Sequence, residues 1–275
     1  MSPLAPRGGE LREAARTWLE VHGAGPPEAL AREVFGMERL ERVLAQRLLG
    51  TLLGGDPAFE LVDGRWRLAP AKRTAAPRPL RSLPFTVVDV ETTGGSPPAD
   101  RVIEVAAVRT RGGRVEEEWS SLVDPDRPVP AFVARLTGID EARLTGAPRF
   151  AEIADAFLEI LGGTPFVAHN APFDWRFLNA ELLRARGGCL TNARVCTLRL
   201  ARRLMPEYRR RNLDALAHAF GIPIEGRHRA LGDARATARI LARLLDLAAE
   251  RGVEDERGLA KLCGIGGTLY PDPAV

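Results

Sequence analysis

Lysine is almost absent from this 275-residue sequence: Lys72 and Lys261 are the only two, so nearly all the positive charge is arginine. Genomic base composition accounts for such a bias without any functional cause. The functional alternative is selection for bidentate phosphate contacts, which arginine makes and lysine does not. The formal net charge of +3 is too small to predict a nucleic-acid partner by itself.

Cysteine is also scarce. Cys189, Cys196 and Cys263 form no CxxC pair and no disulfide framework, which fits buried or incidental thiols in a reducing compartment. The sequence lacks an uninterrupted apolar run long enough to span a bilayer, and residues 1–16 lack the apolar core of a signal peptide. These absences predict a cytoplasmic protein with no membrane partner.

Residues 1–69 predict a small helical domain. Apolar residues recur at helical spacing in LREAARTWLEVHG, PPEALAREVFG and MERLERVLAQRLLGTLL, and FELVDGRWRLA has the Asp-Gly signal of a tight hairpin between two strands. Three helices followed by a hairpin is the order of a winged helix-turn-helix domain. A helical module for protein contacts fits the same pattern, and the sequence leaves both interpretations open.

The composition changes after this domain. Residues 70–84, PAKRTAAPRPLRSLP, are rich in proline, alanine and arginine without periodicity, which predicts a semi-rigid linker. In residues 85–249, strand patterns come first and then alternate with helical ones, which predicts an α/β domain with a mixed sheet flanked by helices. Residues 250–275 form a C-terminal tail, whose end has no periodicity and is either loose or docked.

The stretch FTVVDVETTGG places two carboxylates on one face of a predicted strand. Because side chains alternate along a strand, Asp89 and Glu91 point to one side while Val88 and Val90 point to the other. Carboxylates are depleted in strands and are almost never fully buried without a partner. The pair therefore predicts a compensating group nearby.

Two further acids lie at predicted helix starts. Pro172 suits the first helical position, so Asp174 falls in the first turn, where a lone acid is usually a partner of the helix dipole. In HRALGD, Asp233 begins a helix and resembles an N-cap, with His228 on the preceding loop. Each of these residues has an ordinary structural interpretation on its own.

Together with Asp89 and Glu91, these acids can converge at one edge of a sheet. Two carboxylates 4 Å apart repel by about 1 kcal/mol in water and by about 4 kcal/mol at an effective dielectric constant of 20. Four in one cleft would need protons or a cation. Hard oxygen ligands with one histidine and no nearby cysteine favour Mg²⁺ or Mn²⁺ over zinc. Two such ions are the arrangement used for in-line phosphodiester hydrolysis.

The segments VDVETTG, VAHNAPFD and HRALGD, in this order, resemble the three motifs of the DnaQ-like exonucleases, the DEDD superfamily with a histidine in its third motif. The resemblance covers residues 85–248. It implies a ribonuclease-H-like fold, two metal ions per active site and release of nucleoside monophosphates from 3′ ends.

The resemblance also implies a role for each catalytic residue. Asp89 would bridge both metals, Glu91 and Asp233 would help to hold the first, and Asp174 would support the second. His228 would be the general base that takes a proton from the attacking water, a task that suits histidine because its unperturbed pKa is near neutral.

Substrate contacts are predicted around these acids. Thr92, Thr93 and Gly94 follow the first pair on a tight turn whose backbone can approach the terminal nucleotide. Beside Asp174, the candidates for substrate binding are His169, Asn170 and Phe173. Phe173 can stack on a base or pack in the core, and His169 can instead satisfy a local hydrogen bond.

Arginines cluster between the second and third segments: Arg199, Arg202, Arg203, Arg209, Arg210 and Arg211. Such side chains supply sequence-independent affinity for phosphates. A solvated helix face is the ordinary interpretation of a charge run, whereas the position within the predicted catalytic domain slightly favours binding of a nucleic-acid backbone.

The sequence thus predicts a metal-dependent 3′–5′ exonuclease that acts on single-stranded ends, with DNA favoured, in proofreading or repair. An exonuclease that trims RNA is the alternative within the superfamily, because nothing in the sequence discriminates the sugar. A regulatory DNA-binding protein with a vestigial nuclease domain is an alternative of another class, and the complete set of catalytic residues argues against it. A DNA polymerase or other replication or repair protein is a further expected partner, although no convincing clamp-binding peptide is present.

Overall fold

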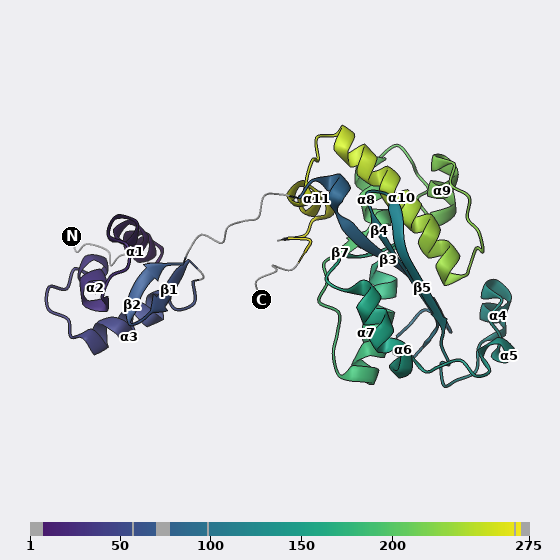
Figure 1. Ribbon diagram of the computed structural model, residues 1–275, viewed down its shortest axis with the longest axis horizontal. Helices are drawn as coiled ribbons and strands as arrows, with labels where there is room; N and C mark the ends of the chain where they lie inside the picture. Colours follow the sequence, from purple (N-terminus) through teal and green to yellow (C-terminus); the bar gives the residue numbers. More distant parts are fainter. Residues whose placement is uncertain (1–7, 57, 70–77, 98, 267, 271–275) are drawn as a thin grey trace. The chain divides into compact units, whose positions relative to one another are not determined.

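The computed structural model describes residues 8–56, 58–69, 78–97, 99–266 and 268–270 (Figure 1). The chain divides into two compact units, residues 1–76 and 77–275. Each unit has a hydrophobic core of its own.

The N-terminal unit consists of three helices followed by a hairpin. Its elements are α1 (Gly8–His22), α2 (Pro27–Phe35), α3 (Arg42–Leu53), β1 (Phe59–Val62) and β2 (Arg65–Leu68). Asp63 and Gly64 form the hairpin turn with φ angles of 49° and 71°, as the Asp-Gly pair predicts. Gly25 and Trp66 form an isolated antiparallel bridge that ties the segment before α2 to the hairpin. This order agrees with a winged helix-turn-helix, and that assignment stays a prediction.

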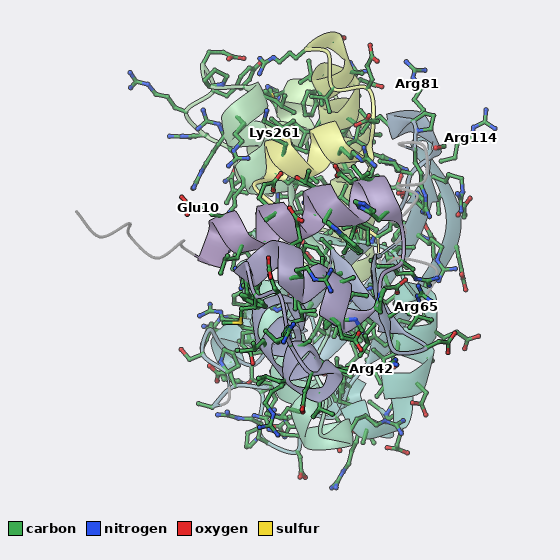
Figure 2. All side chains as sticks on the ribbon, turned by 90° about the vertical axis from the view of Figure 1, so that its left-hand side faces the viewer. Glu10, Arg42, Arg65, Arg81, Arg114 and Lys261 are labelled. Atoms are coloured by element: carbon green, nitrogen blue, oxygen red, sulfur yellow. The ribbon has the colours of Figure 1, made fainter. Side chains whose placement is uncertain are left out.

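The core of the N-terminal unit is formed by one stripe of each helix and by the inner face of the hairpin, and it includes Leu30, Leu49 and Trp66. Arginines lie on the outside of the unit. Figure 2 shows Arg42 at the start of α3 and Arg65 on β2, and both are exposed.

The interval 70–84, predicted to be a linker, is structured in its second half, while residues 70–77 lie outside the described residues. The Leu80 N–H donates to the Glu254 carbonyl oxygen over 2.9 Å, and Leu80 and Leu83 are buried. Apolar side chains therefore dock this stretch on the larger unit. In the sequence, the surrounding prolines and arginines concealed these two leucines.

The larger unit is built on a five-stranded sheet in the order β5-β4-β3-β6-β7. Its strands are β3 (Pro84–Thr92), β4 (Val102–Arg111), β5 (Arg114–Leu122), β6 (Phe166–Ala168) and β7 (Arg194–Cys196). β3, β4 and β5 form an antiparallel meander, and β6 and β7 add parallel strands on the other side of β3. The sheet confirms the predicted mixed α/β fold.

Helices cover both faces of this sheet (Figure 1). The helices of this unit are η1 (Leu80–Ser82), α4 (Ala131–Thr137), α5 (Glu141–Leu144), α6 (Phe150–Leu161), α7 (Pro172–Arg186), α8 (Thr197–Leu204), α9 (Leu213–Phe220), α10 (Ala230–Glu250) and α11 (Glu256–Cys263). α6 and α7 share a core with Val88 and Phe166, while α8 to α11 share one with Phe85 and Val87. Because side chains alternate along β3, its two faces pack in two separate cores. No helix in the described ranges is long and apolar enough to cross a membrane.

The predicted C-terminal tail is docked as far as the structure describes it. Tyr270 is buried, and its hydroxyl donates to the Pro84 carbonyl oxygen over 2.6 Å. Before it, α11 packs against α8. Residues 271–275 lie outside the described residues.

Candidate active site

The first two carboxylates lie on the central strand β3, as the alternation predicts. Val88 and Val90 are buried in the core beside α6 and α7, while Asp89 and Glu91 face the opposite side and are half-buried. The parallel pairing of β3 with the short strand β6 ends at Val87, so this edge of β3 is open farther along. The open edge leaves room for acids from other elements.

Asp174 lies in the first turn of α7, which begins at Pro172 as predicted. The residue is 3% exposed, and its carboxyl accepts hydrogen bonds from the backbone N–H groups of Val90 and of Asp174 itself. Burial raises the pKa of Asp174 to about 8, although these two hydrogen bonds act to lower it. The helix therefore carries this acid into the interior beside β3, where it is more than a partner of the helix dipole.

The third segment forms a loop that turns sharply into α10. Asp233 lies in the first turn of this helix, and the N-cap residue is Arg229, not Asp233 as the sequence suggested. His228 has a left-handed backbone with φ of 60°, which costs a non-glycine residue about 1–3 kcal/mol. A Cβ at Gly232 would collide with backbone carbonyl oxygens of the loop, so the tight turn requires glycine there.

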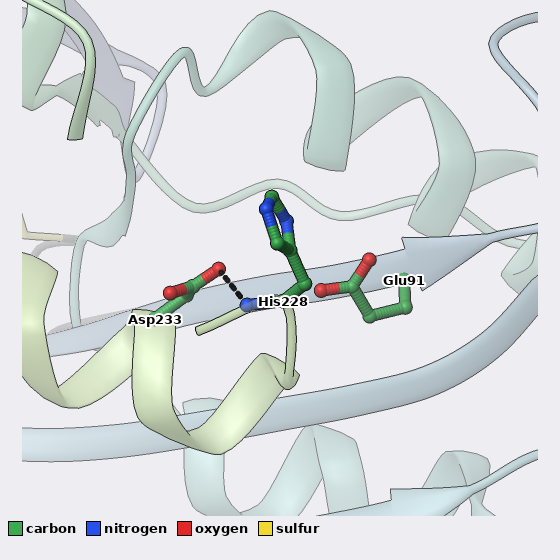
Figure 3. Close-up of side chains that lie close together, drawn as sticks. All are labelled: Glu91, His228 and Asp233. Carbon is green, nitrogen blue, oxygen red and sulfur yellow. Dashed lines mark hydrogen bonds between the residues drawn. The ribbon is translucent and has the colours of Figure 1, made fainter. Parts of the chain in front are cut away.

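Glu91, His228 and Asp233 come closest together, with one possible ligand atom of each within 4.8 Å of the others. Figure 3 shows the imidazole rising from the loop between the two carboxylates. The His228 backbone N–H donates to Asp233 Oδ2 over 3.3 Å. Asp89 interacts with the same group, because the charges of Asp174, Asp233 and Glu91 all raise its pKa. The structure thus brings the five predicted catalytic residues into one site.

The ionised form of each of the four carboxylates is unfavourable in this site. Burial is the largest cause of a raised pKa at Asp89, Glu91, Asp174 and Asp233, and the pKa of Glu91 rises to about 7. Repulsion between the acids adds to it at Asp89 and Glu91. Asp233 Oδ1 is buried and has no hydrogen-bond partner in the described part of the chain. A divalent cation would satisfy this oxygen and offset the repulsion, and hard oxygens with one imidazole fit Mg²⁺ or Mn²⁺.

Arg227 is part of the site, and sequence reasoning missed it. Its guanidinium contacts Asp233 Oδ2, and its Nε lies 2.8 Å from Asp214 Oδ1 on α9. Its Nη1 lies 3.3 Å from His228 Nδ1. The positive charge lowers the pKa of Asp89 and so opposes part of the repulsion. The sequence shows Arg227 directly before His228, but arginine is so frequent in this chain that this position did not stand out.

Two ion pairs that each contain a buried glutamate, also missed, hold the helices of the site to the segment around the start of β4. Arg229 forms a bidentate pair with Glu104 over 2.6 and 3.0 Å, directly after His228. Arg101 forms a bidentate pair with Glu181 on α7 over 2.7 and 2.9 Å. A lone glutamate in the apolar strand RVIEVAAV was the available signal for the first pair. Its partner is 125 residues away in the sequence.

The turn after the first acid pair is held by its own contacts. Thr93 is 1% exposed, and its hydroxyl accepts from the Arg101 N–H over 3.0 Å and lies 3.4 Å from Asp100 Oδ1. The Thr92 hydroxyl donates to the Gly94 carbonyl oxygen over 2.6 Å, and a Cβ at Gly94 would collide with the Asp100 carboxylate. Thr93 therefore supports the turn from inside with its side chain, and substrate contact through its backbone stays a prediction. For Thr92 and Gly94, substrate contact stays a prediction.

The candidates beside Asp174 divide between packing and the surface. His169 Nδ1 lies 3.0 Å from the Thr197 hydroxyl oxygen, and burial lowers the pKa of His169 to about 4. The half-buried Phe173 ring packs 4.9 Å from Phe177, centroid to centroid. Asn170 is exposed. An open groove is lined by His169, Asn170, Leu198, Arg202, Arg209, Arg211 and Asn212. Packing thus accounts for much of Phe173, whereas His169 and Asn170 also face an open surface.

The exonuclease family RNase T matches residues 86–241 of the chain. The epsilon subunit of DNA polymerase III of Aquifex aeolicus is 38% identical over 179 residues, which cover 65% of this chain and 89% of that protein. The PolC-type DNA polymerase III of Bacillus subtilis is 38% identical over 188 residues, which cover 67% of this chain but only 13% of that polymerase. A structure of exonuclease X in complex with 5′ overhanging duplex DNA is 28% identical with a TM-score of 0.53, and the match covers 66% of this chain and 99% of that one.

The family match begins after the N-terminal unit and includes every residue of the carboxylate site. It also includes β3, β4, β5, β6 and β7 almost completely, so the matched region is the mixed sheet with the helices that carry the acids. Sequence motifs, fold and site therefore agree. The chain is a nuclease that belongs to the RNase T exonuclease family, the DnaQ-like exonucleases whose three motifs it carries.

Proposed function

We propose that the chain is a divalent-metal-dependent 3′–5′ exonuclease that hydrolyses single-stranded DNA ends to nucleoside monophosphates. The observation that carries the proposal is the group of four carboxylates with raised pKa values around His228. The neighbouring Arg227 and Arg229 offset only part of their charge. Such a site is stabilised by a bound cation, and a cation held there could in turn bind a phosphodiester.

We assign two Mg²⁺ or Mn²⁺ ions to the carboxylates of Asp89, Glu91, Asp174 and Asp233. When bound, the ions would neutralise the cluster and stabilise the charge that develops on the scissile phosphate. The protein itself supplies the fixed positions of the ligands: two come from one face of β3, one from the first turn of α7 and one from the first turn of α10. Regular elements hold such ligands more rigidly than loops do.

We assign His228 as the general base that takes a proton from the attacking water. Its ring stands beside two of the carboxylates (Figure 3). The flanking residues fix its strained backbone, because Arg227 pairs with Asp214 and Arg229 pairs with Glu104. A positioned base of this kind contributes about 10²–10⁴ in rate.

DNA is the proposed substrate, and proofreading or repair is the proposed setting. Two similar proteins are named as DNA polymerase III or one of its subunits, and exonuclease X is seen with DNA. A DNA polymerase or another replication or repair protein would then be a partner. Trimming of RNA by the same chemistry is the alternative, which a comparison of the two substrates decides. A pull-down that recovers no replicative polymerase would argue against proofreading.

A regulatory protein that binds DNA through its N-terminal unit is less well supported. Residues 1–69 contain nine arginines, no lysine and ten acidic residues, which gives a formal charge of 9 − 10 = −1. Affinity for a DNA backbone depends on positive charge, which this unit does not have in excess. We therefore propose that the unit docks a protein partner. Gel-shift binding of DNA by this unit in the intact chain would argue the opposite.

The test is incubation of the purified protein with 5′-labelled single-stranded DNA or RNA of one sequence, with Mg²⁺, Mn²⁺ or EDTA. We expect a ladder that shortens from the 3′ end, disappears with EDTA and is lost in Asp89→Ala. His228→Ala should slow it by about 10²–10⁴. The faster substrate identifies the sugar. Absence of a ladder under every condition, with variants equal to the unmodified protein, would overturn the proposal.

A further inference from the structure

The arginines between the second and third motifs do not form one surface. Arg199 and Arg203, one turn apart on α8, line a small pocket beside α11. Arg202 and Arg209 line instead the open groove that reaches His169. We refer to this second groove as the arginine groove. The run of arginines therefore divides into two groups with different surroundings, and the two groups can be tested against each other.

Most arginines in and beside the arginine groove have no acidic partner in the described part of the chain. Arg202, Arg209 and Arg210 are exposed and form no ion pair with the described part of the chain. Arg211 differs, because it donates to the carbonyl oxygens of Met205 and Pro206 over 2.8–3.2 Å and so caps the end of α8. Three neighbouring guanidinium groups without acidic partners provide a surface suited to an anion.

The arginine groove reaches the segment that leads into α7. His169 and Asn170 lie between β6 and the first turn of α7, which carries Asp174. The Thr197 hydroxyl lies 3.0 Å from His169 Nδ1, which fixes the start of α8 to this segment. Arg202 on the same helix is therefore held at a defined position relative to the metal ligands.

A second open groove continues from the first at Asn212, which lines both. It is lined by Tyr208, Arg210, Asn212, Asp214, Ala215, His218 and Ala219. Tyr208 is 40% exposed, and Asp214 pairs with Arg227, which contacts the metal ligand Asp233. Both grooves thus reach residues that adjoin the active site, and the loop between α8 and α9 provides side chains to each.

We propose that Arg202, Tyr208, Arg209 and Arg210, which we term the strand-binding surface, hold the nucleotides 5′ to the scissile phosphate. The arginines would contact successive phosphates, and the exposed tyrosine ring would stack on a base. Neither contact reads sequence, so the surface suits an enzyme that must advance along any single strand. This inference rests on the proposed exonuclease function, because that function supplies a strand whose 3′ end lies in the carboxylate site.

The experiment compares two double variants of the full chain that remove the same charge. Arg202→Gln/Arg209→Gln alters the strand-binding surface, and Arg199→Gln/Arg203→Gln alters the pocket beside α11. Binding of a 5′-fluorescein single-stranded 20-mer is followed by anisotropy in EDTA over a series of KCl concentrations. We expect the first variant to reduce the slope of log K against log[KCl] by about 1.4, since each phosphate contact contributes about 0.7. The second should leave the slope unchanged, and Tyr208→Ala should weaken binding about tenfold at every salt concentration.

Equal slopes for the two double variants, or a Tyr208→Ala protein that binds as tightly as the unmodified one, would overturn the strand-binding surface. Hydrolysis of the p-nitrophenyl ester of thymidine 5′-monophosphate by the unmodified protein with Mg²⁺ tests the chemistry separately, because this ester has no upstream nucleotides. If the ester and the 20-mer both stay intact, the proposed function fails, while the anisotropy result still decides whether the surface binds a strand. Circular dichroism of each variant verifies that it is folded.

Discussion

Helix α7 carries two buried carboxylates, Asp174 and Glu181, and the structure treats them in opposite ways. The two residues are 3% and 2% exposed and lie two turns apart, so they share one face of the helix. Glu181 accepts a bidentate pair from Arg101 and a further hydrogen bond from the Val102 N–H. Asp174 has backbone N–H donors only, and burial raises its pKa to about 8. Burial therefore does not distinguish the two acids, whereas the presence of a cationic partner does.

The same division applies across the site. Glu104 on β4 is matched by Arg229, while Glu91, opposite it in the β3–β4 register, has a pKa raised by burial to about 7. The paired acids fix the helices that surround the site. The acids with raised pKa values are kept in a state that costs free energy without a cation, which is the state a metal site requires.

The largest effect is expected from removing the charge of Asp174, the acid of α7 that has no cationic partner. Asp174→Asn should abolish exonuclease activity, by more than about 10³, since a metal ligand is lost. In EDTA the same change should stabilise the fold, because asparagine keeps the backbone hydrogen bonds and removes the repulsion with Asp89. A gain of about 1 kcal/mol would raise Tm by about 2–4 °C. Gel assays and thermal unfolding measure the two effects, and a lower Tm for Asp174→Asn in EDTA would contradict the argument.

The pH dependence of stability provides the second test. The pKa values of Asp174 and Glu91, about 8 and about 7 in the folded chain, exceed the ordinary values of 3.8 and 4.5 for these side chains. Between these limits the folded state binds more protons than the unfolded state, so the free energy of unfolding falls as pH rises. Metal-free protein should therefore have a higher Tm at pH 5 than at pH 8.

Magnesium should reverse most of this loss. Mg²⁺ binds the ionised carboxylates of the folded state, so its addition should raise Tm at pH 8 and have little effect near pH 5, where protons occupy the site. Asp174→Asn is the matched variant, and its metal-free Tm should change less with pH. If the Tm of the metal-free protein rose steadily from pH 5 to pH 8, the carboxylates of the site would not have the raised pKa values on which this prediction depends.

Much of this site could be predicted from local sequence. Strand alternation gives the shared face of Asp89 and Glu91, and Pro172 gives the first turn that contains Asp174. These features depend on residues a few positions apart. The N-cap role expected for Asp233 was wrong, because the helix begins three residues earlier, at Ala230.

The partners of the acids could not be predicted in this way. Arg229 and Glu104 are 125 residues apart, and Arg101 and Glu181 are 80 residues apart, so only the folded sheet reveals them. The buried role of Thr93 has the same origin, since its partners come from the loop that returns to β4. Local patterns thus identify the proposed metal ligands, and long-range pairs decide which other polar residues are structural.

A smaller effect on activity, and an effect of opposite sign on stability, are expected at Glu181, the second acid of α7. Glu181→Gln removes one partner of a buried ion pair, so it should destabilise the fold by about 1.5–3 kcal/mol, with or without Mg²⁺. Activity measured well below Tm should fall less than in Asp174→Asn, because no metal ligand is lost. Thermal unfolding of the two variants side by side measures the difference. If Glu181→Gln proved as stable as the unmodified chain, a cationic partner would not be what separates the two acids.

The smallest effect is expected at a bidentate pair that water reaches. Arg235 on α10 and Glu118 on β5 form hydrogen bonds as Arg229 and Glu104 do, but their side chains are 39% and 28% exposed. Exposed pairs contribute about 0–1 kcal/mol, so Glu118→Gln should change the free energy of unfolding by no more than that and leave activity intact. The comparison then has three levels: an acid without a partner, a buried pair and an exposed pair. A loss at Glu118 equal to that at Glu181 would show that bidentate geometry, rather than burial of the pair, determines the cost.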